Sequence, residues 1–123
     1  MRYDPMVAPD PSQWLVSSEW DRLDAVLRQH KRARERSGND RVHAAIHVTV
    51  ENQLAEGYGP AVSAMERLLG EGLGRHEALH AIGSLVAGQI FGALKNGVVD
   101  NAAYANALET LTAESWRRSG DDE

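Results

Sequence analysis

The sequence of 123 residues contains no cysteine. This absence excludes disulfide bonds, thiolate metal ligands and thiol nucleophiles, so any metal site has to be built from His, Asp or Glu. A chain without cysteine is compatible with a reducing compartment, and we expect a cytoplasmic protein.

Long hydrophobic runs and positive charge are also scarce. The longest apolar stretches are far shorter than the roughly 18 to 20 residues that span a bilayer, so we expect no membrane segment. Residues 1–11 carry three prolines and two aspartates where a secretory signal needs an unbroken apolar segment. The formal net charge of -5 disfavours nonspecific binding to nucleic acid, which depends on Lys and Arg.

Helical periodicity dominates what is present. Apolar residues recur at spacings of three and four, no strand-like alternation is found, and hydrophobic residues make up 42% of the chain. We therefore predict an all-α protein, a compact bundle of four to five helices. The expected helices cover about 18–36, 40–56, 60–70 and 75–96, with a last one beginning at 101 after a short turn of helix near 11–15. Residues 1–10 are expected to form an extended arm, 11–118 one domain, and 119–123 a disordered tail.

Two His-x-x-x-His pairs are the most informative motif. Residues four apart share one face of a helix, with Cβ atoms about 5 to 6 Å apart, so His43 with His47 and His76 with His80 could each chelate an ion. If the helices 40–56 and 75–96 lie side by side, the four imidazoles converge. Buried histidines are costly unless they are hydrogen-bonded or coordinated, and the alternative to a metal is a network of neutral histidines.

Two further residues belong to the same pattern. Glu51 continues the first pair, but it lies about 12 Å along the helix from His43, so one ion cannot easily take all three residues. It is expected either to join His47 and the second pair as a ligand, to orient a ligand, or to bind a second ion. His30 shares the inward face of its helix, and its role is left open.

The donor types limit the choice of metal. Sites made only of nitrogen suit zinc, copper or nickel, whereas an added carboxylate with an open position suits iron or catalytic zinc. We expect a divalent transition metal, with zinc as first candidate and iron or nickel as alternatives. No residues are assigned to an organic cofactor.

A hydrolase is the second hypothesis. His76-Glu77-Ala78-Leu79-His80 matches His-Glu-x-x-His, the zinc peptidase motif in which the glutamate activates water, so Glu77 would be catalytic. Val86 stands where the related pattern with three histidines needs its third ligand, and no strand is expected to bind a peptide. Glu77 is equally compatible with a solvent-facing position.

Several segments together resemble a family of small bacterial proteins catalogued as a domain of unknown function. The resemblance covers about Asp10 to Lys95 and comprises Asp10-Pro11-x-x-Trp14-Leu15, His43-Ala44-Ala45-Ile46-His47 with Glu51-Asn52-Gln53-Leu54, and Glu71-Gly72-Leu73-x-Arg75-His76-Glu77-Ala78-Leu79-His80-Ala81-Ile82. It implies a bacterial, cytoplasmic, helical protein in which the four paired histidines and Glu51 are recurring polar positions. In part of that family another residue stands in place of Glu77, which counts against the peptidase hypothesis. The resemblance implies no activity.

A third hypothesis is a metal-free protein-interaction module. The histidines would then form a polar network, and Trp14, Trp20 and Tyr58 would contact a partner, although aromatic packing in the core is the commoner use of such residues. The partner would be a second copy of the chain or an unidentified protein.

Overall fold

The computed structural model describes residues 1–33 and 39–121, and all regular structure in these ranges is helical. The all-α prediction is therefore confirmed, but seven helices replace the expected four to five. They are α1 (Pro11–Val16), α2 (Glu19–Ala33), α3 (Asp40–Ala55), α4 (Gly59–Gly70), α5 (Arg75–Asn96), α6 (Asn101–Thr110) and α7 (Ala113–Asp121). The end expected for the helix 18–36, at residues 34–36, lies outside the described residues.

Local side-chain chemistry explains where the helices begin. The Asp10 carboxylate accepts a hydrogen bond from the Gln13 backbone N–H at 3.0 Å, and Pro11 occupies the first turn of α1. Ser18 caps α2 in the same way, accepting from the Asp21 N–H at 3.1 Å. Asn39 caps α3. Each side chain satisfies a backbone donor that has no partner inside the helix.

The last predicted helix is divided in two by a break near residue 111. Leu111 has an extended backbone, and the Thr112 hydroxyl then accepts from the Ser115 N–H at 3.0 Å, which starts α7 as a new helix. Buried Leu111 stays in the core at this corner. Because α7 runs to Asp121, residues 119–121 continue a helix instead of forming the expected disordered tail. Residues 122–123 lie outside the described part.

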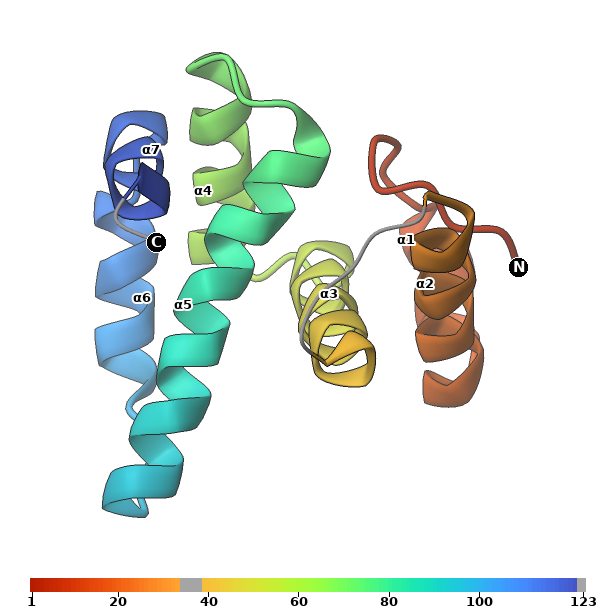
Figure 1. Ribbon diagram of the computed structural model, residues 1–123, viewed down its shortest axis with the longest axis horizontal. Coiled ribbons are helices and arrows are strands. Elements are labelled where there is room, and N and C mark those ends of the chain that lie inside the picture. The colour runs from red at the N-terminus through yellow and green to blue at the C-terminus, as the bar shows by residue number, and fades with distance from the viewer. Residues whose placement is uncertain (34–38, 122–123) are drawn as a thin grey trace.

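Helix α3 occupies the middle of the molecule. Figure 1 shows it nearly end-on, with α2 on one side and α5 on the other, and both neighbours pack against it. Helices α4 and α6 lie along α5 on the side away from α2. The predicted packing of the helices 40–56 and 75–96 is confirmed, since α3 and α5 are in direct contact.

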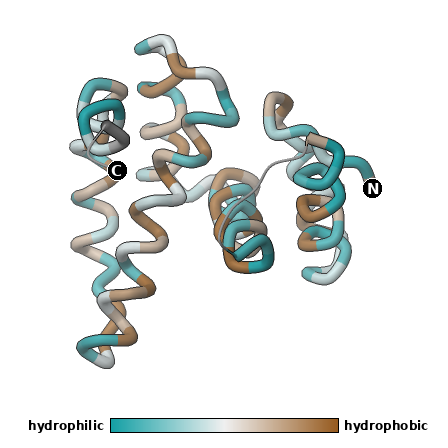
Figure 2. Tube along the Cα trace, in the orientation of Figure 1, coloured by the Kyte–Doolittle hydropathy of each residue, from teal (hydrophilic) through white to brown (hydrophobic). Residues whose placement is uncertain are grey.

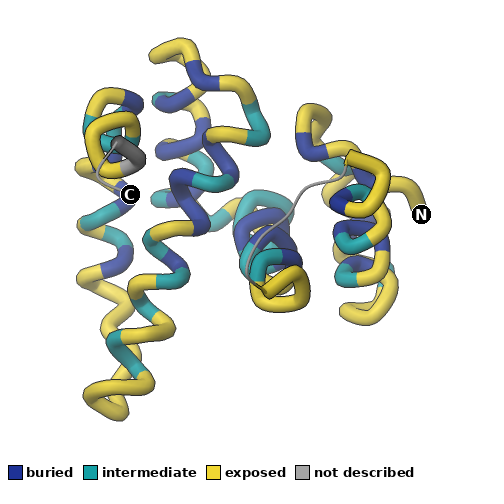
Figure 3. The backbone as a smooth tube through the Cα atoms, viewed as in Figure 1, coloured by how far each residue is buried: buried dark blue, intermediate teal, exposed yellow. Residues whose placement is uncertain are grey.

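Two groups of buried apolar residues flank α3, and buried positions are coloured dark blue along the backbone in Figure 3. The C-terminal core joins α4, α5 and α6 and includes Leu68, Leu79, Ile82 and Leu108. The N-terminal core joins α1, α2 and α3 and includes Tyr3, Trp14, Val26 and Val48. The arm at residues 1–10 contains no helix and turns where the Val7 N–H donates to the Asp4 carbonyl, and Tyr3 anchors it in the N-terminal core with only 2% of its surface exposed.

Helix α5 has two different halves. Its first half is buried in the C-terminal core, whereas Ile90, Phe91 and Leu94 in its second half are exposed. Figure 2 shows brown, hydrophobic segments along the whole helix. By length and composition α5 could cross a membrane, although the sequence was expected to hold no such segment. This is weak support for a membrane span, because a core helix passes the same test.

Candidate metal centre

All five histidines of the chain meet where α2, α3 and α5 pack together. His30 comes from α2, His43 and His47 from α3, and His76 and His80 from α5. The ring centroids of His43 and His47 are 5.0 Å apart, those of His76 and His80 are 4.5 Å apart, and those of His47 and His80, which lie on different helices, are 5.0 Å apart. The expected convergence of the two pairs is thus present in the structure.

His30 completes the cluster from the opposite side of α3. Its ring centroid lies 4.7 Å from that of His43 and 5.2 Å from that of His47, and only 3% of its surface is exposed. The sequence placed His30 on an inward face but left its role open. The structure shows that α2 carries it to the same position as the two pairs.

The donor atoms form two overlapping sets of three. Ring nitrogens of His30, His43 and His47 lie within 4.8 Å of one another, and so do those of His47, His76 and His80. With metal–nitrogen bonds of about 2.1 Å, two nitrogens on one ion are at most about 4.2 Å apart. Small side-chain rotations would therefore bring either set onto one ion. His47 is the member that both sets share.

His47 has the least favourable environment of the five. Its side chain is 2% exposed, and neither Nδ1 nor Nε2 has a hydrogen-bond partner among the residues that the structure describes. Burial, followed by the neighbouring histidines, lowers its pKa from 6.5 to about 2. The same causes lower the pKa of His80 to about 4. The two imidazoles are therefore neutral at physiological pH, with lone pairs free to bind a metal.

Glu51 lies one helical turn after His47, and it is bound by other residues. Its carboxylate accepts two hydrogen bonds from the Arg75 guanidinium, at 2.7 and 2.8 Å, and a third from the Tyr3 hydroxyl at 2.5 Å. Burial and the negative charge of Glu51 raise the pKa of Tyr3, which keeps the hydroxyl protonated as a donor. Glu51 thus ties the arm and α5 to α3, and it belongs to neither set of three histidines.

Glu77 belongs to neither set of three histidines. Its side chain is exposed, and its carboxylate accepts a hydrogen bond from the Trp116 indole N–H at 3.3 Å. A glutamate that activates metal-bound water has to reach the open position of the metal. The Glu77 geometry does not favour the peptidase hypothesis, even though its sequence motif is complete.

A cavity of about 250 Å³ reaches the cluster from outside. His43, His47 and His80 line its inner end, and Leu79 and Trp116 are among its apolar walls. Water and small molecules can therefore approach these three histidine side chains from outside, while both ring nitrogens of His47 and Nε2 of His80 are themselves buried. A metal at these histidines would keep a route for an exchangeable ligand.

A glycine explains why α3 and α5 come close enough for the rings to meet. A Cβ atom built on Gly83 would lie 2.9 Å from the Ile46 Cγ2, closer than real Cβ contacts. Ile46 cannot easily move its Cγ2, because a β-branched side chain has one strongly preferred rotamer in a helix. Gly83 therefore permits the short distance between the two helices at the histidine cluster.

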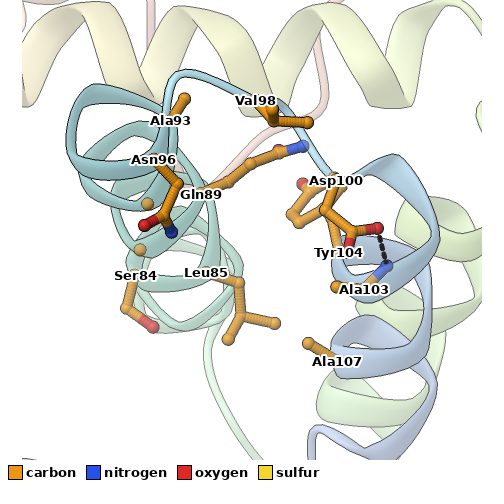
Figure 4. A pocket seen from close by; sticks show the side chains of 12 residues that line it. Ser84, Leu85, Gln89, Ala93, Asn96, Val98, Asp100, Ala103, Tyr104 and Ala107 are labelled. Carbon is orange, nitrogen blue, oxygen red and sulfur yellow. Dashed lines mark hydrogen bonds between the residues drawn. The ribbon is translucent and has the colours of Figure 1, made fainter.

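A second cavity, of about 360 Å³, has no metal-binding chemistry. It lies between the second half of α5 and the start of α6, as Figure 4 shows, and its walls include Leu85, Ala93, Val98 and Ala107. Asp100 is the one carboxylate among its lining residues, and it accepts a hydrogen bond from the Ala103 backbone N–H. The volume exceeds that of the cavity above the histidines, but the donors for a metal are in the smaller one.

The aromatic residues considered as partner contacts have three different surroundings. Trp14 is 2% exposed and belongs to the N-terminal core, where its indole N–H donates to Asn52. Tyr58 is half-buried and packs against the C-terminal core. Trp20 is 75% exposed and is the one of the three with a free surface.

Tyr3 and Arg75 were not among the predicted site residues. Tyr3 lies in a segment without helical periodicity, and Arg75 would be taken for an ordinary first-turn residue of α5. The nearest signal was Glu51, a carboxylate on an inward face, which needs a charged partner when buried.

Comparison with known proteins adds no relative: no family model matches the chain, and neither a curated protein nor a solved structure matches it significantly.

Proposed function

We propose that this protein binds a divalent transition metal through its cluster of five histidines. The observation that carries the proposal is His47, which is buried with two unpartnered ring nitrogens at the centre of the cluster. Leaving a buried polar atom without a partner costs about 1 to 3 kcal/mol, and His47 has two such atoms. A bound metal would give these nitrogens a partner and so offset this cost.

Zinc is the first candidate, with nickel next and iron after both. The two sets of donors contain imidazole nitrogens alone, a donor set that suits zinc, copper or nickel. Iron sites usually add a carboxylate, and the nearest buried one, Glu51, is already held by Arg75 and Tyr3. In this proposal Glu51 positions α3 and α5 through Arg75 and Tyr3 instead of binding the ion, a role that was not among the three expected for it.

The competing explanation is a network of neutral histidines without metal. In such a network each N–H needs an acceptor, and single core histidines usually find one on a backbone carbonyl. His47 has none in the described part of the chain. The network therefore leaves its central member unsatisfied, which favours the metal.

Elemental analysis of protein purified without an affinity tag tests the proposal. We expect near-stoichiometric transition metal in the wild type and a clear loss in His47→Ala and His80→Ala. A chelator should also lower the Tm of the wild type, since an ion that binds only the folded state stabilises it by about 2.7 kcal/mol at a hundred times its Kd. Protein that takes up no metal after reconstitution, with a Tm indifferent to chelator, would refute the proposal.

The hydrolase alternative has its own control in Glu77→Gln. Because Glu77 is exposed and bonded to Trp116, we expect the variant to keep its metal content and its Tm. If the variant kept its metal but lost a metal-dependent hydrolytic activity, the peptidase hypothesis would replace ours.

A further inference from the structure

We propose that the centre holds two metal ions and that His47, as an imidazolate, bridges them. The inference rests on the proposed metal-binding function and deepens it. One ion would be bound by His30, His43 and His47, and the other by His47, His76 and His80.

The first argument is the arrangement of donors in two sets. A single mononuclear site would need one group of three or four nitrogens, with the remaining histidines further away. Instead, two groups of three satisfy the same distance limit of 4.8 Å, and they share one residue. The groups also come from different helix pairs, since α2 and α3 supply the first and α3 and α5 supply the second.

The second argument is the condition of the shared residue. Nδ1 and Nε2 of His47 are both buried, and neither has a hydrogen-bond partner in the described part of the chain. A histidine that binds one metal normally donates its other ring N–H to a carboxylate, a carbonyl or water, which fixes the ring. The Glu51 carboxylate, one turn away, accepts from Arg75 and Tyr3 instead. A second metal ion would give the other nitrogen of His47 its missing partner.

The third argument concerns charge. Two divalent ions in a buried site repel each other strongly, because the low dielectric of the interior weakens screening. Neutral histidines do not reduce this repulsion, and the charge of Glu51 is already paired with that of Arg75. An imidazolate places one negative charge between the ions. The cavity lined by His43, His47 and His80 would admit water or hydroxide to the remaining positions.

The bridge requires one proton to leave. Neutral His47 carries one ring N–H, and the first ion binds the nitrogen that has a lone pair. When the second ion binds, the N–H bond breaks, its electron pair becomes the bond to the metal, and the proton passes to the buffer. No oxidant, reductant or other reactant is needed.

The test is a titration of metal-free wild-type protein with Zn²⁺ at pH 8, well above the ordinary histidine pKa of about 6.5. Bound zinc is measured after desalting, and released protons are counted with a pH indicator. His30→Ala and His76→Ala each remove a ligand of one ion only, so each variant should keep one equivalent. Water on zinc can also lose a proton. The protons released by the two variants are added together, so that the sum includes any proton lost from zinc-bound water at each ion. The wild type should release one proton more than this sum.

The results separate this inference from the function on which it rests. Two equivalents with the additional proton support the bridge. A single equivalent in the wild type, or two equivalents without the additional proton, overturns the bridge and leaves metal binding intact. No retained zinc refutes both. If either alanine variant is unfolded by circular dichroism, His30→Asn or His76→Asn replaces it in the proton count, and a wild type that retains fewer than two equivalents overturns the bridge without any variant.

Discussion

The two sides of α5 pack in opposite ways. Toward α4 and α6 the contact is apolar, and Leu68, Leu79, Ile82 and Leu108 are completely buried there. Each such side chain contributes about 1.5 to 3 kcal/mol by leaving water. Toward α3 and α2 the contact contains five histidines and a buried ion pair. The difference teaches that the C-terminal core stabilises the fold by apolar burial, while the histidine cluster buries polar groups, among them the two unpartnered nitrogens of His47, at a cost in stability.

The largest effect on stability is expected from breaking the buried ion pair between Glu51 and Arg75, on the polar side of α5. Glu51→Gln should leave the Arg75 charge buried without its counterion, and removing one partner of a buried pair costs about 3 to 5 kcal/mol. Chemical denaturation measures this loss, and metal affinity should fall with it because α3 and α5 lose a shared anchor. Asp24→Asn is the control, since the Asp24–Arg28 pair is exposed and should contribute at most about 1 kcal/mol. Equal effects of the two changes would remove the structural role given to Glu51.

The next prediction concerns His47→Leu, which should make the polar contact of α5 more like its apolar contact with α4 and α6. In metal-free protein, His47→Leu replaces two unsatisfied buried nitrogens by an apolar side chain of similar size, and we expect the free energy of unfolding to rise by about 1 to 3 kcal/mol. The same variant should gain no stability from added zinc. Denaturant titrations with and without zinc measure both effects. A metal-free variant less stable than the metal-free wild type would contradict the cost assigned to the histidine cluster.

Acid should destabilise the polar contact of α5 with α3 and α2, but not its apolar contact with α4 and α6. Four histidines, His30, His43, His76 and His80, surround His47, and burial with their proximity keeps the His47 pKa at about 2 in the folded state against 6.5 ordinarily. Unfolded protein therefore binds the proton first. The stability of metal-free protein should be constant above about pH 6.5 and fall below it, by up to about 1.4 kcal/mol per pH unit for His47 alone. His47→Leu should show a shallower slope, and equal slopes would disprove the assignment.

The smallest effect is expected from two glycines of α5. Gly88→Ala has open space around the new Cβ and should stabilise the helix by about 0.8 to 1 kcal/mol. Gly83→Ala gains the same helix propensity but forces α3 away at Ile46, so it should lose metal affinity and show little or no gain in Tm. Calorimetry and zinc titration of the pair measure both outcomes. Full metal affinity in Gly83→Ala would show that the close approach of the helices is not needed.

The sequence by itself determined the helices, the inward faces and the pairing of the histidines, because these depend on spacings of three and four along a single helix. The capping residues Asp10, Ser18 and Asn39 are equally local, since each accepts a hydrogen bond from a backbone N–H three residues further along the chain. The break at Leu111 was missed because Leu111 fits the apolar period of a continuing helix, and the cap at Thr112 resembles an ordinary polar residue.

Only the tertiary structure decided which donors meet. His30 joins the cluster because α2 packs on the far side of α3, and Glu51 turns to Arg75 and Tyr3 because the arm folds back against α3 and the start of α5. Neither contact leaves a periodic trace, since each joins segments that are far apart in the chain. The physical reason is that helical periodicity fixes the direction of a side chain on its own helix, whereas the partner it reaches depends on how whole helices pack.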